Sequence, residues 1–352
     1  MQVIFDTQNI YYIPQYYPIY KVLIENNIEC IFVCYTGKND QSVFAKEIPG
    51  NQVWVSGKEQ ALDYYLKTKP DWIFFGNAFQ GLEQIHQYSK TAQLGHGVGP
   101  KPSYYRKSDT PMTVRFMEGE LRLRIIKQMY PEDTFVQVGF SKLDPIFDGS
   151  EQGIDLVAKQ LDTSKKTLLY APTFNPSSLE RFPDNWPEKF SDYNVLIKPH
   201  AFTYTRKQYK GQRKKLKKWA SYANCYVAPV EDYSLLPYLK TADLLISEAS
   251  STLFEFVVLD KPVIVANFFK LKWSYRGPFS YRFEKRFGKD NVIYNKIGTH
   301  ISKFSQLKNA VKQQLANPQE YREQRAQYRQ DHIGPVDGKA SQRIVDYLLE
   351  RR

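Results

Sequence analysis

Cysteine is scarce in this chain, and its spacing does not suit metal binding. Only three cysteines occur among 352 residues: Cys30, Cys34 and Cys225. An odd and sparse set argues against a disulfide framework and against a cysteine-based zinc site. Cys30 and Cys34 lie four residues apart in the strand-like run IECIFVCY and so share one face of it. We interpret them as core residues of a protein in a reducing compartment.

Long apolar runs are also missing. No stretch approaches the roughly 18 residues that a membrane span requires. The first residues, MQVIFDTQNIYY, lack the basic region and the apolar stretch of a signal peptide. We therefore expect a cytoplasmic protein, either free or peripheral on the inner face of the membrane. Low-complexity segments and short repeats are absent from the sequence, and aromatic residues make up 15% of it, so the chain should be globular.

The charge is unbalanced, because 49 Lys and Arg residues against 37 Asp and Glu residues give a net charge of +12. Such a field attracts nucleic acid, an anionic membrane surface or a phosphate-rich substrate. Much of the excess lies in residues 207–223, KQYKGQRKKLKKWASYA, where Trp219 and Tyr222 follow the cations. Two interpretations of this segment stay open: a solvated helix face, and a surface that lies against anionic lipid.

Short apolar runs alternate with amphipathic stretches through both halves of the chain. VIF, IECIFVCY and DWIFFGN occur in the first half, and TLLYAPT, YNVLIKPH, DLLISEAS and KPVIVANF in the second. This alternation is typical of βα units on a parallel sheet. We predict an α/β fold with two Rossmann-like domains, residues 1–155 and 156–330, that face each other across a cleft. A C-terminal helix in residues 331–352 should pack back on the body.

The stretch LLISEASSTLFEF places a polar cluster where a buried strand turns into a helix. Ser250, Ser251 and Thr252 would occupy the helix N-terminus, where backbone N–H groups without helical partners hold anions and hydroxyls add donors. A plain N-cap is the alternative. Glu255 lies one turn further along, where a carboxylate can accept hydrogen bonds from both hydroxyls of a ribose. The cluster therefore predicts a site for a nucleotide diphosphate and its sugar.

The longer run ADLLISEASSTLFEFVVLDKPVIV is similar to the pattern ADxLITDYSSxxFDFxxLxKPIIF of the CDP-glycerol glycerophosphotransferases, GT-B enzymes that build teichoic-acid-like polymers. HGVGPK has the spacing of the family's HGxxxK, and VGFSKLDPIF resembles its G-(Y/F)-(P/S)-(K/R)-x-D turn. LLYAPTF, VLIKPH and IGPVDGKASQRIVDYLL resemble its LYAPTW, KxHP-like and DGKASERIVD elements. Three positions near the expected donor site depart from the family: Asn175 replaces a common Arg, and Glu248 and Ala249 replace Asp and Tyr.

The resemblance implies a transferase that moves glycerol phosphate, or a related alditol phosphate, from a CDP-linked donor to a hydroxyl group, releasing CMP. The acceptor would be a cell-surface polysaccharide or a lipid-linked saccharide. The resemblance also implies that His96 is the base that deprotonates this hydroxyl, a task that suits the pKa of imidazole. It assigns His200 to catalysis as well. The residues expected to bind the donor are Lys101, Thr173, Lys198, Ser250, Ser251, Thr252 and Glu255.

Several of these residues have simpler interpretations. A turn-capping hydroxyl is an equal alternative for Thr173, and a strand end that points into solvent is the alternative for Lys198 and His200. We expect no cofactor apart from the CDP-glycerol or CDP-alditol substrate. We also expect no metal site, because Asp144 in SKLDP is isolated from other acidic residues.

Two other functional classes stay open. A GT-B glycosyltransferase that uses a nucleotide sugar, or a UDP-sugar 2-epimerase, would use a similar ribose-binding Glu. The HGVGPK and GFSKLD motifs favour phosphotransfer by resemblance. A basic nucleic-acid-binding protein is the third class, but the sequence contains no module that interleaves cations with stacking aromatics. We therefore expect no nucleic-acid partner.

Overall fold

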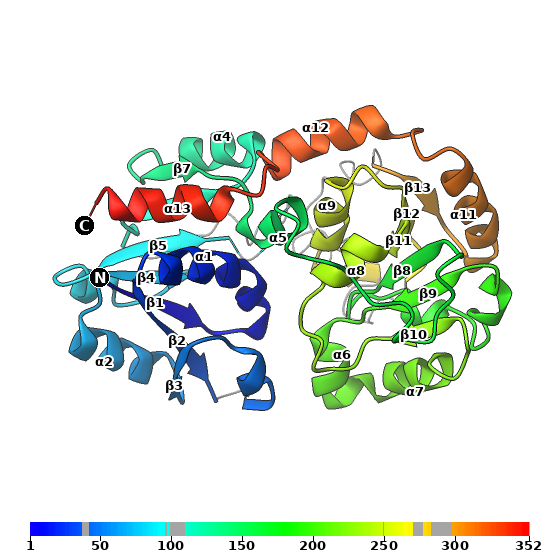
Figure 1. Cartoon of the computed structure of the whole chain (residues 1–352), viewed down its shortest axis with the longest axis horizontal. Coiled ribbons are helices and arrows are strands. Elements are labelled where there is room, and N and C mark those ends of the chain that lie inside the picture. The colour runs from blue at the N-terminus through cyan, green and yellow to red at the C-terminus, as the bar shows by residue number, and fades with distance from the viewer. Residues whose placement is uncertain are drawn as a thin grey trace. The chain divides into compact units, whose positions relative to one another are not determined.

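The chain folds into two compact units, each built on one parallel sheet (Figure 1). The computed structural model describes residues 1–36, 42–95, 97–98, 110–248, 250–269, 277–282 and 297–351, without the side chains of residues 43, 44 and 47. The first unit contains the described residues up to Ser150 and those from Gln330 onward, and the second contains Glu151–Arg329. The α/β fold class predicted from the sequence is confirmed.

The first unit contains a seven-stranded parallel sheet in the order β3-β2-β1-β4-β5-β6-β7. Val3 in the central strand pairs with Cys30 on one side and with Trp72 on the other. The strand order reverses between β1 and β4, the kind of switch point at which parallel sheets bind ligands. The strands are β1 (Gln2–Thr7), β2 (Glu29–Tyr35), β3 (Asn51–Val55), β4 (Trp72–Phe75), β5 (Lys90–Leu94), β6 (Val114–Met117) and β7 (Phe135–Gln137).

The predicted C-terminal helix is present and belongs to the first unit. It is α13 (Ala340–Leu349), which packs against α1 (Ile13–Glu25). Tyr347 on α13 lies edge-on to Phe116 of β6, with ring centroids 5.4 Å apart. The other helices of this unit are α2 (Lys58–Thr68), α3 (Leu82–Ile85), α4 (Glu120–Met129) and α5 (Asp144–Phe147), with 3-10 turns at Ile10–Tyr12, Ser42–Glu47 and Ser141–Leu143.

Asp144 in the GFSKLD turn fixes the start of this C-terminal helix. Its two carboxylate oxygens accept hydrogen bonds from the backbone N–H groups of Ala340 (3.1 Å) and Ser341 (2.7 Å). A carboxylate at this position satisfies amides that have no partner within the helix and is favoured by the helix dipole. Two motifs that lie about 200 residues apart in the sequence therefore form one structural contact.

The second unit contains a six-stranded parallel sheet in the order β10-β9-β8-β11-β12-β13. Its switch point lies between β8 and β11, where Ala171 pairs with Ser247. The strands are β8 (Thr167–Ala171), β9 (Asn194–Ile197), β10 (Cys225–Val227), β11 (Leu244–Ser247), β12 (Val263–Ala266) and β13 (Thr299–Ile301). The helices are α6 (Ala201–Thr205), α7 (Lys210–Trp219), α8 (Leu236–Thr241), α9 (Ser251–Val257), α11 (Leu307–Ala316) and α12 (Arg322–His332), which contains the boundary between the units.

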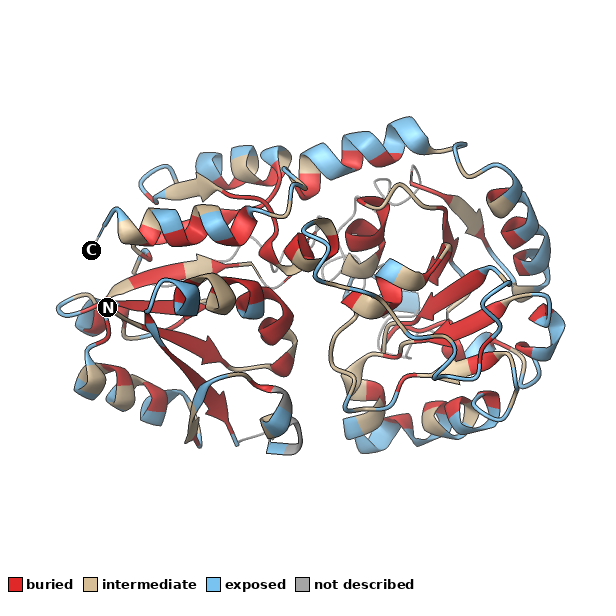
Figure 2. Ribbon diagram, in the orientation of Figure 1, coloured by how far each residue is buried: buried red, intermediate tan, exposed pale blue. Residues whose placement is uncertain are grey.

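Most strands are buried, although the edge strands β3 and β7 of the first sheet are only partly so, whereas the outer faces of the helices are exposed (Figure 2). The core of the second unit is strongly aromatic: the ring of Phe182 lies 4.4 Å from that of Tyr170 and 5.1 Å from that of Trp186. All three cysteines are free and buried, as predicted for Cys30 and Cys34. Burial raises the pKa of each thiol to about 12, so none is a ready nucleophile.

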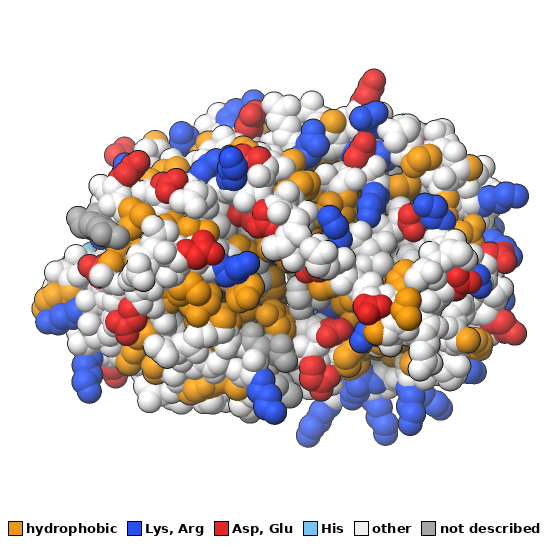
Figure 3. Space-filling view, viewed as in Figure 1, with side chains coloured by type: hydrophobic (Ala, Val, Ile, Leu, Met, Phe, Trp, Pro, Cys, Tyr) orange, Lys and Arg blue, Asp and Glu red, His pale blue; other side chains and the backbone are white. Residues whose placement is uncertain are grey.

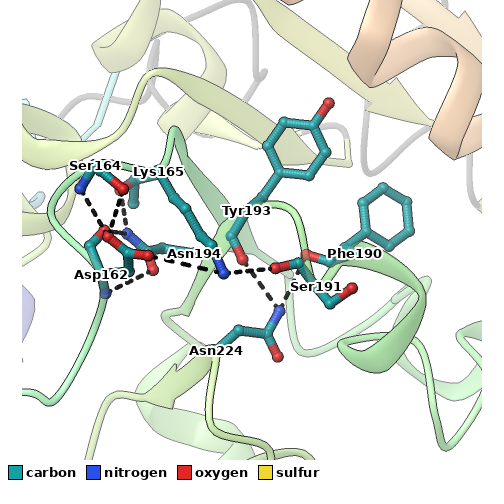
Figure 4. A network of polar contacts seen from close by, with 9 residues as sticks. Asp162, Ser164, Lys165, Phe190, Ser191, Tyr193, Asn194 and Asn224 are labelled. Atoms are coloured by element: carbon teal, nitrogen blue, oxygen red, sulfur yellow. Dashed lines mark hydrogen bonds and ion pairs between the residues drawn. The ribbon is translucent and has the colours of Figure 1, made fainter.

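A polar network at the amino edge of the second sheet closes the turns that lead into its strands (Figure 4). The side-chain amide of Asn194 donates to the carbonyl of Asp162 at 2.7 Å, and that of Asn224 donates to the carbonyls of Phe190 (3.0 Å) and Tyr193 (3.1 Å). These amides add hydrogen bonds to turn carbonyls, two of which also accept from backbone N–H groups: Asp162 from Lys165, and Phe190 from Tyr193. We interpret this edge as structural.

Candidate active site

The carboxyl edge of the second sheet brings most of the predicted donor-binding residues together. Thr173 follows β8, Lys198 and His200 follow β9, and the polar cluster follows β11. These three strands are neighbours in the order β9-β8-β11. Because all of them are parallel, their carboxyl ends meet at one edge, next to the switch point.

The polar cluster starts α9 as the sequence predicts. Ser250 is the N-cap, and its Oγ accepts a hydrogen bond from the backbone N–H of Thr252 at 3.3 Å. The capping geometry is therefore present, while Ser251 and Thr252 are half-buried at the start of the helix. Glu255 lies one turn further along and is only 3% exposed. Ala249 lies outside the described residues.

His200 is held in a defined tautomer at the start of α6. Its Nδ1 accepts a hydrogen bond from the backbone N–H of Phe202 at 3.1 Å. The neutral ring therefore carries its proton on Nε2, from which it can donate to a ligand oxygen. The ring centroid lies 4.7 Å from that of Phe174 and 4.8 Å from that of Phe202. The Nζ of Lys198 lies 5.9 Å from the ring centroid of Tyr238.

Thr173 uses both of its hydrogen-bond donors within the protein. Its hydroxyl donates to the carbonyl of Pro176, and its backbone N–H donates to Oε2 of Glu248 at 2.8 Å. This is the turn-capping arrangement that the sequence leaves as an alternative. In this arrangement the Thr173 hydroxyl can still accept a hydrogen bond, but its proton is engaged in the turn.

His96 and Lys101 lie outside the described residues, whereas Gly95 and Gly97, which flank His96 in the sequence, are described. Arg122 Nη1 donates to the carbonyl of Gly97 at 3.1 Å and to Glu118 Oε2 at 2.9 Å. A Cβ added at Gly95 would come within 2.7 Å of Glu118 Oε1. Gly95 therefore packs closely against a buried ion pair.

This ion pair was not singled out by sequence reasoning. Glu118 follows β6, the neighbour of β5, and burial raises its pKa. Oε1 of Glu118 is buried and has no hydrogen-bond partner among the described residues. His332 is buried as well, and burial lowers its pKa to about 4, so its ring is neutral near pH 7. The sequence does contain a signal for this ion pair: an acidic residue directly after a buried strand, followed by Arg four residues later.

Comparison with known proteins identifies the family. The family model for CDP-Glycerol:Poly(glycerophosphate) glycerophosphotransferase matches residues 118–350. The chain belongs to this family. It is 32% identical over 139 residues to a teichoic acid glycerol-phosphate primase of Bacillus spizizenii, and 27% identical over 140 residues to one of Bacillus subtilis. Each match covers 38% of the chain and 33% of the relative, so the chain matches about one third of the length of these curated relatives.

Solved structures support the fold of this family member. A structure of the wall teichoic acid polymerase TagF is similar with a TM-score of 0.68 at 17% identity, covering 99% of this chain and 88% of that one. UDP-GlcNAc 2-epimerase from Neisseria meningitidis, bound to UDP-GlcNAc, is similar with a TM-score of 0.61 at 13% identity, covering 99% and 100%. The fold is thus shared with a wall teichoic acid polymerase and an epimerase, and it does not choose between their functions. The family match favours the glycerophosphotransferases.

Glu248 is a further residue at the carboxyl edge of this glycerophosphotransferase-family chain, and the sequence marked it only as a departure from the family pattern. Its side chain is buried, and its Oε1 accepts hydrogen bonds from the backbone N–H (2.6 Å) and the hydroxyl of Ser178. Burial raises the pKa of Glu248 to about 7, while the donors from Ser178 and Thr173 oppose this shift. Within the described ranges, no group of three or more His, Cys, Asp and Glu side chains could hold a metal ion.

The basic segment forms a cationic face on α7, where Lys and Arg side chains gather in Figure 3. Trp219 cannot take part in the membrane contact considered for residues 207–223, because its side chain is fully buried in the core. Gln212, Leu216 and Trp219 form the inner face of the helix. The exposed cations of this region are Arg206, Lys207, Lys210, Lys214, Lys217 and Lys218. No helix in the described parts of the chain is long and apolar enough to cross a membrane.

Proposed function

We propose that this protein transfers glycerol phosphate from CDP-glycerol, or an alditol phosphate from a related CDP-alditol, to a hydroxyl group of a teichoic-acid-type or lipid-linked acceptor. The observation that carries the proposal is the family match over residues 118–350, which includes every expected donor residue from Thr173 to Glu255. The geometry adds support, because these residues follow three neighbouring strands at a switch point. The proposal includes no organic cofactor and no protein-bound metal, as the resemblance implies.

In the proposed reaction, the acceptor oxygen attacks the β-phosphorus of the donor and the bond from this phosphorus to CMP breaks. His96 takes the proton of the acceptor hydroxyl. Lys198 and the Nε2–H of His200 stabilise charge on the diphosphate, and Lys101 is assigned to the donor as well. Phosphoryl transfer depends mainly on such positioning and charge stabilisation. The hydroxyls at the start of α9 add donors, and the carboxylate of Glu255 accepts hydrogen bonds from the ribose.

Cytidine nucleotides are expected to stabilise the protein more than uridine or adenine nucleotides. The measurement is a thermal-shift and calorimetry panel of CMP, CDP, UMP, UDP and ADP, with CDP-glycerol and CDP-ribitol alongside. A ligand at a hundred times its Kd stabilises the native state by about 2.7 kcal/mol, so preferences should be clear. The CDP-alditol with the largest effect names the donor. A preference for UDP would contradict the proposal and favour the epimerase or glycosyltransferase class.

A matched pair of variants tests whether the nucleotides of this panel bind at the proposed site. Glu255→Gln should weaken CMP binding about tenfold or more, because hydrogen bonds to a charged group contribute about 1.5–3 kcal/mol. Glu188→Gln, at an exposed position in the same unit, should leave the affinity unchanged. Equal affinities in both variants would return Glu255 to a purely structural role.

We further propose that the cationic face of α7 lies against the anionic inner surface of the membrane, where a lipid-linked acceptor would be reached. The triple variant Lys210→Glu, Lys214→Glu and Lys217→Glu changes three exposed cations on one side of the helix. Each cation near an anionic surface contributes about 1 kcal/mol, so the partition coefficient on vesicles with anionic lipid should fall about a hundredfold. Vesicle sedimentation at low and high salt measures it.

A control with the same change in net charge uses exposed cations elsewhere in the chain, Lys308→Glu, Lys312→Glu and Arg329→Glu. This variant should bind vesicles nearly as well as the wild type. If both triple variants lose binding equally, net charge rather than the face of α7 attracts the membrane. If neither loses it, the proposed membrane surface is wrong.

A further inference from the structure

We propose that Glu248 is a positioning residue of the donor site, which holds the loop of residues 172–178 in place and, through Phe174, seats the imidazole of His200. The kinetic part of this proposal rests on the proposed function. The structural part rests on contacts between described residues alone.

The contacts of Glu248 close the loop that follows β8. Its Oε2 accepts from the backbone N–H of Thr173 at 2.8 Å, and its Oε1 accepts from the backbone N–H of Ser178 at 2.6 Å and from the Ser178 hydroxyl. One carboxylate thus binds two amides at the two ends of the loop. The Ser178 hydroxyl also contacts the hydroxyl of Tyr170 in β8 at 2.8 Å, which anchors this end to the sheet.

Burying a carboxylate at a core position is energetically unfavourable. Glu248 is 1% exposed, and removing an ionised carboxylate from water is unfavourable unless hydrogen bonds compensate. Apolar side chains of similar volume generally fill such positions at lower cost. The three donors from Thr173 and Ser178 all belong to the loop 172–178, so the role that these contacts support is to fix this loop at the switch point.

The loop in turn contacts His200 through Phe174. The two ring centroids are 4.7 Å apart with an interplanar angle of 55°, and the carbonyl of Phe174 accepts from the side-chain amide of Gln212 at 3.3 Å. The other side of the imidazole is fixed by the Phe202 N–H at Nδ1. Two constraints therefore set the direction of Nε2–H, and one of them depends on the loop that Glu248 holds.

Glu248→Gln tests the role with little change in shape. Whichever way the introduced side-chain amide is turned, its NH₂ group faces a backbone N–H, so either Thr173 or Ser178 loses its acceptor. Hydrogen exchange in residues 172–178 should become about tenfold faster or more, and the imidazole NMR signals of His200 should shift. The KM for the CDP-linked substrate should rise about tenfold, with a smaller change in kcat. The reason is that a misdirected Nε2–H of His200 weakens binding of the substrate's diphosphate already in the ground state.

Two further variants make the test decisive. Ser178→Ala removes one of the three donors and should produce a smaller change in the same direction, which keeps the test available if Glu248→Gln folds poorly. Glu188→Gln, an exposed carboxylate in the same unit, should change none of the readouts. A general structural defect would lower the active fraction, and hence kcat, at an unchanged KM.

The proposal is overturned if Glu248→Gln leaves exchange in the loop unchanged. It is also overturned if the loop opens while the His200 signals and the KM for the donor stay at wild-type values. Failure of the proposed function looks different: the wild type would then bind no cytidine nucleotide, and the exchange and His200 measurements would still decide the positioning role.

Discussion

Replacing His96 by alanine is expected to lower kcat by about a hundredfold to ten-thousandfold, the usual contribution of a general base. The acceptor hydroxyl has a high pKa and needs a group that takes its proton as the bond to phosphorus forms. Binding of the donor should stay near the wild-type value, because all but one of the residues expected to hold it follow β8, β9 and β11 of the second unit. Single-turnover kinetics with a CDP-alditol, together with CMP calorimetry, would measure both effects.

His86→Ala is a matched control from the same unit. His86 precedes β5, at the opposite end of the strand from the turn of His96, and its Nε2 lies 2.7 Å from the hydroxyl of Thr91. Its loss should affect stability slightly and turnover little. If His96→Ala retains turnover near the wild-type value, the base lies elsewhere and the assignment from the HGVGPK motif is wrong.

Replacing Gly119 by alanine is expected to destabilise the first unit by at least about 1–3 kcal/mol, the usual cost of overpacking. A Cβ at this position would lie 2.2 Å from the carbonyl oxygen of Asp331 and 2.5 Å from its carbonyl carbon. Both are backbone atoms, so no rotation of a side chain relieves the clash. Gly334 has a similar role from the other side: its φ is +79°, and a Cβ there would lie 2.3 Å from the carbonyl oxygen of Glu118.

The clash introduced by Gly119→Ala should act mainly on the C-terminal segment. Residues from Gln330 onward belong to the first unit, so a clash at Gly119 should displace them and expose the α1 face on which α13 packs. Urea denaturation measures the loss. Gly57→Ala is the matched control, because Gly57 also precedes a helix, has extended backbone and has no atom within 4 Å of an added Cβ. Equal midpoints for the two variants would contradict the proposed close packing.

Local patterns in the sequence were sufficient for the fold class. The short β-rich runs predict strands because their side chains are buried on both faces of parallel sheets. The polar cluster after LLIS marks the start of α9 correctly, because capping is decided by neighbouring residues. The burial of Trp219 is also predictable from the sequence, since Gln212, Leu216 and Trp219 have the spacing of one helix face, although the run of lysines around them masks this pattern.

Contacts between distant segments were decided by tertiary structure. The hydrogen bond from Thr173 to Glu248 spans 75 residues, and it forms because β8 and β11 are neighbours in the sheet although two strands separate them in sequence. The tautomer of His200 depends on the backbone geometry at the start of α6. The role of Asp144 depends on where α13 docks. The sequence by itself determined which residues form strands, helices and caps, because these depend on local propensity and periodicity. Only the tertiary structure decided which of those residues meet, because strand order and helix docking are set by the packing of the whole core.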